Sequence, residues 1–186
     1  RRQRQMCIRD RYRVRKGNPS ESIEYIHHLH MSGDTEGLAE ALSEEGHSLV
    51  KAGHIELLGI LRVLEASLFG PRTRFVIHEL TGDILSIQGR WDEAEEQYDH
   101  ALPIAVKHKL TTPLARIYSS RADLAVKKGE MDNALSLHKK ALEMQIKLRD
   151  AQGAARSYNN MGYIFRRQRD NKRAIEVYGN VEELLE

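Results

Sequence analysis

Three histidines at positions 27, 28 and 30 are the residues of this chain whose spacing suits a metal ion. His27 and His30 lie three residues apart, so on a helix they would share one face and could bind zinc or nickel together. Such a site needs a third ligand, a carboxylate or histidine from a distant segment. The alternative is that Ile26 and Leu29 face the core while the histidines lie at its rim. We adopt this second interpretation and expect neither a metal nor a cofactor.

Groups that could catalyse a reaction are equally sparse. The sequence has no Gly-x-Ser-x-Gly run and no Gly-x-x-x-x-Gly-Lys-[Ser/Thr] run, and its single cysteine is Cys7. Acidic pairs such as Glu44-Glu45 and Glu95-Glu96 are adjacent in sequence, so on a helix their side chains diverge. We therefore expect no enzymatic activity from these residues.

The elements that would position any site repeat at a fixed interval. Small residues recur every 40 positions in two series, and so does a ring-bearing position. A period between 20 and 50 residues is the signature of a solenoid, in which each unit buries its apolar face against the next. The three series are Gly82, Ala122 and Gly162; Ala94, Ala134 and Ala174; and Tyr98, His138 and Tyr178.

The apolar periodicity predicts six helices in the regular part, over 72–88, 91–108, 113–128, 131–149, 154–168 and 171–185. Thr112 should cap the third of these, with Pro113 in its first turn. Gly89 and Gly129 separate the two helices of a unit, where a positive φ is needed. Pro103 should kink or end the helix that contains it.

The segment before the regular part is also predicted to be helical. Ser20 or Ser22 should cap a first helix, and Asp34 or Thr35 a second helix that ends near Gly53. A third stretch, 55–68, is apolar nearly all round, which indicates a helix buried between its neighbours.

These units resemble tetratricopeptide repeats. The pattern in the first unit is Gly82, Leu85, Gly89, Trp91, Ala94, Tyr98 and Ala101-Leu102, and the later units carry it with changes. The resemblance implies an all-α, right-handed superhelical solenoid of about nine antiparallel helices. It places three repeats at about 72–110, 112–150 and 152–186, within 71–186, after degenerate hairpins over 20–70. Arg169 and Asn171 replace the usual glycine and aromatic residue, and the 40-residue interval exceeds the usual 34.

In that family the first helix of each hairpin lines a concave surface that holds a protein or peptide. The resemblance thus implies a non-catalytic scaffold or adaptor with its ligand in this groove, and Asn159 resembles the asparagine that binds a peptide backbone. The surface should change from acidic at Glu79 and Asp83 to basic in the third repeat. The expected groove residues are Arg116, Ser119, Asp123, Arg156, Asn159, Tyr163 and Arg166, with Val76, Ser86 and Val126 at related positions.

Residues 23–34, IEYIHHLHMSGD, carry a fainter resemblance to the helical sensor region of STAND signalling ATPases. This resemblance implies an alternative function, in which the array is the regulatory part of an ATPase or transcription regulator. The nucleotide-binding part would then lie upstream of this sequence.

Residues 1–10, RRQRQMCIRD, resemble the translation of a transposase adapter used to prepare sequencing libraries. We expect residues 1–11 to be non-native, 12–19 to be a linker and the chain to be a fragment. The alternative is a natural basic arm that binds nucleic acid or anionic lipid. Removing the five arginines and one aspartate of residues 1–11 changes the formal net charge from +2 to −2, so binding to nucleic acid is not expected.

Two further expectations concern location and assembly. No apolar run approaches the roughly 20 residues of a membrane helix, and we expect a cytoplasmic protein without membrane contact. The last helix, with Ile175, Tyr178, Val181, Leu184 and Leu185, has no polar capping helix after it. We therefore expect that the array continues in a longer protein, or that this helix packs on a partner or on a second copy of the chain.

Overall fold

The structure, a computed structural model, describes residues 18–64 and 68–183. The expected adapter at 1–11, residues 12–17 of the expected linker, and Leu184 and Leu185 lie outside the described residues. Within the described ranges the chain forms nine helices and no strand, which confirms the predicted all-α fold. The helices are α2 Pro19–Ser32, α3 Thr35–Lys51, α4 Leu57–Val63, α5 Pro71–Ile87, α6 Trp91–Lys107, α7 Thr111–Lys128, α8 Met131–Lys147, α9 Ala151–Arg167 and α10 Asn171–Glu183.

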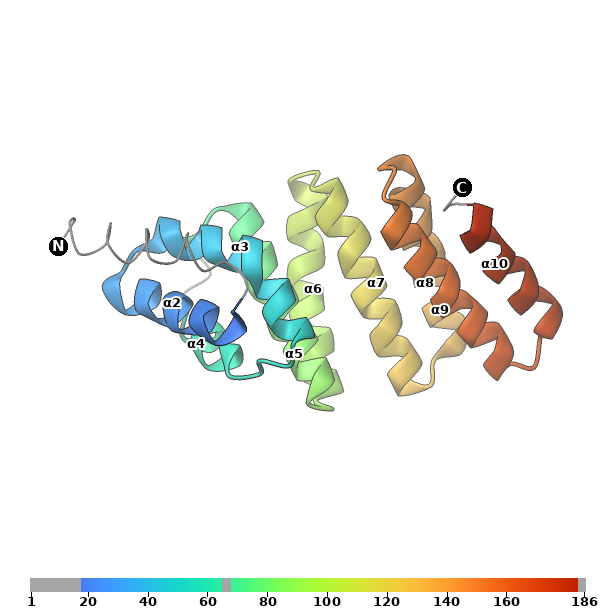
Figure 1. The fold of residues 1–186 in the computed structure, drawn as a ribbon, viewed down its shortest axis with the longest axis horizontal. Coiled ribbons are helices and arrows are strands. Elements are labelled where there is room, and N and C mark those ends of the chain that lie inside the picture. Colours follow the sequence, from blue (N-terminus) through green and yellow to red (C-terminus); the bar gives the residue numbers. More distant parts are fainter. Residues whose placement is uncertain (1–17, 65–67, 184–186) are drawn as a thin grey trace.

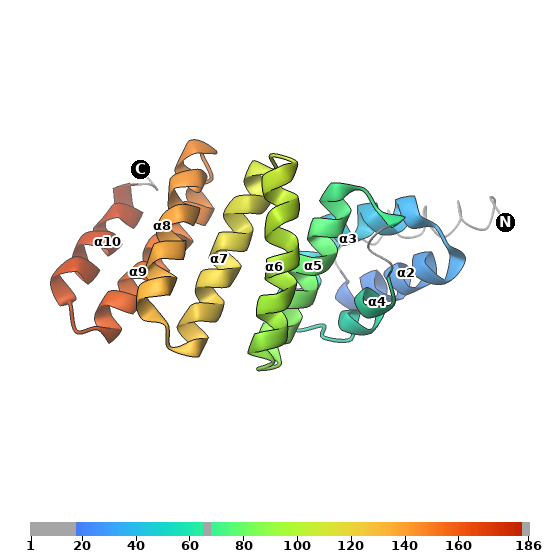
Figure 2. The same ribbon diagram turned by 180° about the vertical axis from the view of Figure 1, so that it is seen from behind.

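The six helices from α5 onward pair into three hairpins, α5–α6, α7–α8 and α9–α10. Each hairpin packs on the next mainly through the second helix of one and the first helix of the following one. Figures 1 and 2 show the hairpins side by side along the long axis, with α2 near one end and α10 at the other. This arrangement confirms the predicted solenoid. We call α5, α7 and α9 the first-helix layer.

The turns inside the hairpins follow the glycine prediction in two cases. Gly89 and Gly129 have φ of 77° and 84°, in the left-handed region that glycine enters without steric cost. The third hairpin places Arg169 there instead, with φ 62°. A side chain in this region costs roughly 1 kcal/mol relative to glycine, so the third turn is the more strained one.

Two predictions about helix starts are wrong. The N-cap of α2 is Asn18, whose side chain accepts a hydrogen bond from the Ser20 amide, so neither Ser20 nor Ser22 is the cap. Helix α7 begins at Thr111, before the expected cap Thr112, without any side-chain cap. Pro113 still lies in the first turn, where its missing N–H leaves no intrahelical bond unmade. The Asp34 cap of α3 is confirmed by its bond to the Gly37 amide at 2.9 Å.

Of the two effects expected of Pro103, a kink or a helix end, the second does not occur, because α6 continues to Lys107. The missing N–H removes one hydrogen bond to the carbonyl of Asp99. Pro103 faces solvent, while Ala101 and Ala105 on either side of it are fully buried. Tertiary packing of those alanines holds the helix together across the proline.

The N-terminal part departs from the regular pattern. Helix α4 covers only Leu57–Val63, and although Leu57 and Leu61 are buried, Ile55 and Val63 are 44% and 61% exposed. The described part of the stretch 55–68 is therefore not a helix buried on all sides, and residues 65–67 lie outside the described residues. Helix α3 takes the larger part in packing against α5, which brings α3 side chains next to the first-helix layer.

The apolar core changes along the array. One cluster of buried side chains runs from α2 to α7, whereas two smaller clusters serve the last two hairpins. At the α7–α8–α9 junction three of the buried side chains are polar, and Gln145 lies between Ser119 and Ser157 at 3.3 and 2.7 Å. Apolar contacts also cross this junction, where Ile164 of α9 is buried with Ala125 and Ala134.

Within each hairpin a small residue faces a ring. A methyl group added at Gly82 would lie 2.5 Å from a Tyr98 ring carbon, and one at Gly162 would meet Tyr178 in the same way. In the middle hairpin the equivalent pair is Ala122 with His138, both fully buried. Alanine, which is larger than glycine, is thus paired with the imidazole, which is smaller than the phenol of tyrosine. The summed volume of the two side chains is therefore similar in the three hairpins.

We expect Gly162→Ala to lower the free energy of unfolding by about 1–3 kcal/mol through overpacking. Adding Tyr178→His should recover part of this loss, because it reproduces the Ala122–His138 pair. Gly179→Ala is the control: an added methyl group meets nothing within 4 Å there, and the change favours the helix. Denaturant unfolding gives the free energies of the unaltered chain, the two single variants and the double variant. If the loss in the double variant equals the sum of the losses in the two single variants, this account is contradicted.

Candidate binding surface

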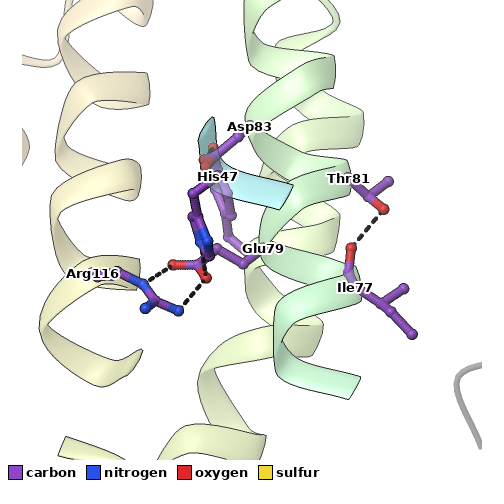
Figure 3. A network of polar contacts seen from close by, with 7 residues as sticks. His47, Ile77, Glu79, Thr81, Asp83 and Arg116 are labelled. Carbon is purple, nitrogen blue, oxygen red and sulfur yellow. Dashed lines mark hydrogen bonds and ion pairs between the residues drawn. The ribbon is translucent and has the colours of Figure 1, made fainter. Parts of the chain in front are cut away.

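Glu79 in α5 occupies the centre of a charged network in the first-helix layer. Its carboxylate is 1% exposed and lies between α3 and α7, as Figure 3 shows. It lies 2.8 Å from Nε2 of His47 and accepts hydrogen bonds from Nε and Nη2 of Arg116 at 3.0 and 2.7 Å. Burial opposes the charge of Glu79, yet the bonds to His47 and Arg116 hold its pKa below the ordinary value.

Asp83, one turn further along α5, has a different environment. It accepts a hydrogen bond of 2.7 Å from the Tyr98 hydroxyl and another from Ser120. Burial, followed by the nearby Glu79 carboxylate, raises the pKa of Asp83 to about 6. The predicted acidic surface is therefore wrong at Glu79, which is buried in an ion-pair network. Asp83 is half-buried, and its carboxylate is held by the hydrogen bond from Tyr98.

The expected groove residues of the second repeat are also held in contacts inside the protein. Arg116 is bound to Glu79, and Ser119 is only 3% exposed, with its hydroxyl donating to the Ala115 carbonyl at 3.3 Å. Asp123 accepts a hydrogen bond of 2.8 Å from Asn160 in α9. The contacts of Arg116 and Asp123 join neighbouring first helices, so this part of the layer is an interface between repeats.

His138 lies beside Asp123 in a position that corresponds to Tyr98 beside Asp83. Its ring is fully buried, its Nε2 is 3.5 Å from Asp123 Oδ1, and neither ring nitrogen has a hydrogen-bond partner. Burial, together with the nearby Arg156, lowers the pKa of His138 to about 4. The imidazole is therefore neutral at pH 7.

The third repeat differs, because Arg156, Asn159, Tyr163 and Arg166 are all exposed on α9. Their spacing of three, four and three residues places them in one stripe along the helix. The structure thus brings these four expected residues together on an accessible face. It separates them from Arg116, Ser119 and Asp123, which are held in contacts between repeats.

Sequence reasoning missed two participants, His47 and Asn160. Asn160 stands 40 residues after Ser120, so the repeat itself held a signal for it. His47 comes from α3, which lies outside the regular register, and only the packing of α3 on α5 shows its role.

The histidines of α2 are at the opposite end of the array from α9. His27 and His28 are exposed, and with Met31 and Val63 they line a largely apolar groove of about 820 Å³ between α2 and α4. In the part of the chain that the structure describes, no group of three or more histidine, cysteine, aspartate or glutamate side chains could hold a metal ion. A search of the same residues finds no helix long and apolar enough to cross a membrane.

A family model described as tetratricopeptide repeat matches residues 113–186, which cover α7 to the end of α10. The chain carries tetratricopeptide repeats (TPR) over residues 113–186. Repeats of this family generally mediate protein–protein interactions and are generally non-catalytic.

The TPR fold is shared with a known structure. The crystal structure of BtubC (BKLC) from P. vanneervenii is 23% identical, covers 95% of this chain and 68% of that chain, and superimposes with a TM-score of 0.59. No curated protein matches the chain. The fainter resemblance of residues 23–34 to STAND ATPases receives no support from these comparisons, and it stays a prediction.

Removing Arg116 should destabilise the TPR array strongly, because it leaves the buried Glu79 charge with His47 alone. We expect Arg116→Ala to lower the free energy of unfolding by about 3 kcal/mol. Arg156→Ala changes the equivalent, exposed position one repeat later and should cost less than about 0.5 kcal/mol. Equal losses in denaturant unfolding would contradict the role of the buried charge.

Asp83 should make stability depend on pH. Its folded pKa of about 6 lies above the ordinary 3.8, so its contribution is most favourable below pH 4 and is lost as the pH rises toward 6. Asp83→Asn should therefore raise the free energy of unfolding at pH 7 by roughly 1–2 kcal/mol, since one pKa unit is about 1.4 kcal/mol. The gain should vanish near pH 4, and Asp92→Asn, at a fully solvated carboxylate, should show none. A gain independent of pH would exclude this explanation.

Proposed function

We propose that the chain is a non-catalytic protein-binding module whose ligand contacts the first-helix layer at α9. The observation that supports this most is the chemistry of one helix face. Arg156, Asn159, Tyr163 and Arg166 are exposed in one stripe along α9.

The chemistry of the stripe suits a protein or peptide ligand. Arg156 and Arg166 can each donate two parallel hydrogen bonds to a carboxylate. Asn159 can both donate to and accept from a peptide backbone. Tyr163 is 45% exposed and offers rigid contact area with little loss of side-chain entropy. Arginine and tyrosine are also the residue types that contribute most to binding energy at protein interfaces.

The proposal also places the module in the cytoplasm. Outside residues 1–11 the sequence has no cysteine, so the fold does not depend on an oxidising compartment.

The test is capture of a partner from cells of the source organism, followed by affinity measurements with the purified partner. Arg156→Ala and Asn159→Ala should each weaken binding by about fivefold to tenfold, since exposed interface residues of this kind are worth roughly 1 kcal/mol. Neither change should alter the melting temperature, because both side chains are exposed. The control is Arg72→Ala, at an exposed arginine of α5. Unchanged affinity in both variants would count against α9 as the binding surface.

A further inference from the structure

Two histidines that are 22 residues apart in sequence lie side by side on the first hairpin. His78 of α5 and His100 of α6 have ring centroids 5.3 Å apart, and their planes are tilted by 36°. His78 is half-buried, whereas the side chain of His100 is 57% exposed. The pair can therefore be reached from solvent, and the exposed ring has room to turn.

The other hairpins have different side chains at these two positions. Forty residues later, the ammonium group of Lys140 lies over the ring of Tyr118, 5.8 Å from its centroid. Eighty residues later, the two positions hold Tyr158 and Asn180. The pair of imidazoles is thus a property of the first hairpin and not of the repeat, so the packing of a hairpin does not require it.

A hydrogen bond fixes which nitrogen of His78 carries the proton. Nδ1 lies 3.0 Å from Oε1 of Gln97, and a carbonyl oxygen only accepts, so Nδ1 donates and Nε2 keeps its lone pair. Histidines that bind metals almost always donate their other nitrogen to an oxygen atom in this way. Burial lowers the pKa of His78 below its ordinary value, against the effect of the bond to Gln97. The ring is therefore neutral at pH 7, which is the form that a metal ion binds.

The separation of the two rings suits one shared ion. A bond from a metal to an imidazole nitrogen is about 2.0–2.1 Å long, so two imidazoles on one ion have ring centroids about 5 Å apart. The observed 5.3 Å is close to this separation. A turn of the exposed His100 ring then aims one of its nitrogens at an ion bound to Nε2 of His78.

Two opposite charges flank the pair. Glu96, one turn before His100, has a carboxylate oxygen 4.0 Å from Nε2 of His100 and attracts a cation. Arg74, one turn before His78, is close enough to contribute to the lowered pKa of His78, and it repels a cation. The imidazoles, and not a local excess of charge, therefore provide the affinity.

We propose that His78 and His100 form a binding site for a first-row transition-metal ion. No group of three suitable ligands is found among the described residues, so water molecules complete the coordination of the ion. By the general order of affinities, Cu²⁺ binds more tightly than Ni²⁺, and Ni²⁺ more tightly than Co²⁺. The ion links α5 to α6 and stabilises the first hairpin by mass action. This site is independent of the proposed surface on α9.

The test is calorimetric titration of the folded full chain with CuCl₂ and with NiCl₂ at neutral pH. Every variant carries Cys7→Ser, which removes the single thiol as a competing ligand. We expect both ions to bind, with Cu²⁺ at least about tenfold tighter than Ni²⁺. The affinity should fall below about pH 6, because protons then compete for the imidazoles.

Single substitutions make the test specific to this pair. His78→Ala and His100→Ala should each weaken binding by more than about tenfold, because each removes one of two ligands. Gln97→Leu keeps both imidazoles but removes the bond that orients one of them, so it should weaken binding by about tenfold. The matched control is His27→Ala with His28→Ala, which removes two exposed histidines of α2 and should leave the site unchanged. Circular dichroism verifies that each variant is folded.

Transplanting the pair tests whether these positions suffice. Tyr118→His with Lys140→His places two imidazoles at the same positions of the second hairpin, and Leu137→Gln supplies the equivalent of Gln97. This triple variant should bind one more Cu²⁺ ion per chain than the parent does.

Three results would overturn the inference. They are the absence of binding by either ion, an affinity that both His78→Ala and His100→Ala leave unchanged, or binding that disappears with His27→Ala and His28→Ala, which would assign it to α2. None of these results bears on the proposed function, which is judged by partner capture through α9.

Discussion

The buried charge of Glu79 is the constraint on which the first half of the array depends. A carboxylate removed from water is stable only when its partners are held in place, and these partners come from two other helices, His47 of α3 and Arg116 of α7. The irregular N-terminal helices and the regular repeats are thereby fixed relative to each other. An apolar contact would also join them, but it would tolerate sliding, whereas an ion pair with bidentate geometry does not.

A second constraint acts inside each hairpin, where the approach of two helices is set by a small residue against a ring. Gly82 with Tyr98, Ala122 with His138 and Gly162 with Tyr178 are three solutions of similar volume. The pair in the middle hairpin also differs in its polar contacts. The Tyr98 hydroxyl donates a hydrogen bond to Asp83, whereas the His138 imidazole has no hydrogen-bond partner. Packing volume is thus conserved between repeats more closely than polar contacts are.

The fold could be predicted from the sequence because it follows from periodicity. In the regular part every helix boundary up to the start of α10 lies within three residues of the predicted one, since a 40-residue repeat supplies the same information three times. The candidate surface could be predicted only in part. Periodicity shows which residues share a helix face, but not whether the next repeat covers it, so Glu79 and Ser119 were placed on a surface that α7 and Gln145 in fact close. His47 could not be found at all, because α3 does not follow the repeat.

The hydrogen bonds of Gln145 have a consequence for how the third hairpin is held. Apolar contacts also cross this junction, since Ile164 of α9 is buried with Ala125 of α7 and Ala134 of α8. An apolar contact tolerates small shifts, whereas a hydrogen bond is directional, so the bonds of Gln145 to Ser119 and Ser157 fix the orientation of α9 against α7 and α8. The direction in which the exposed side chains of α9 face therefore depends on a buried residue that no ligand of that surface would contact.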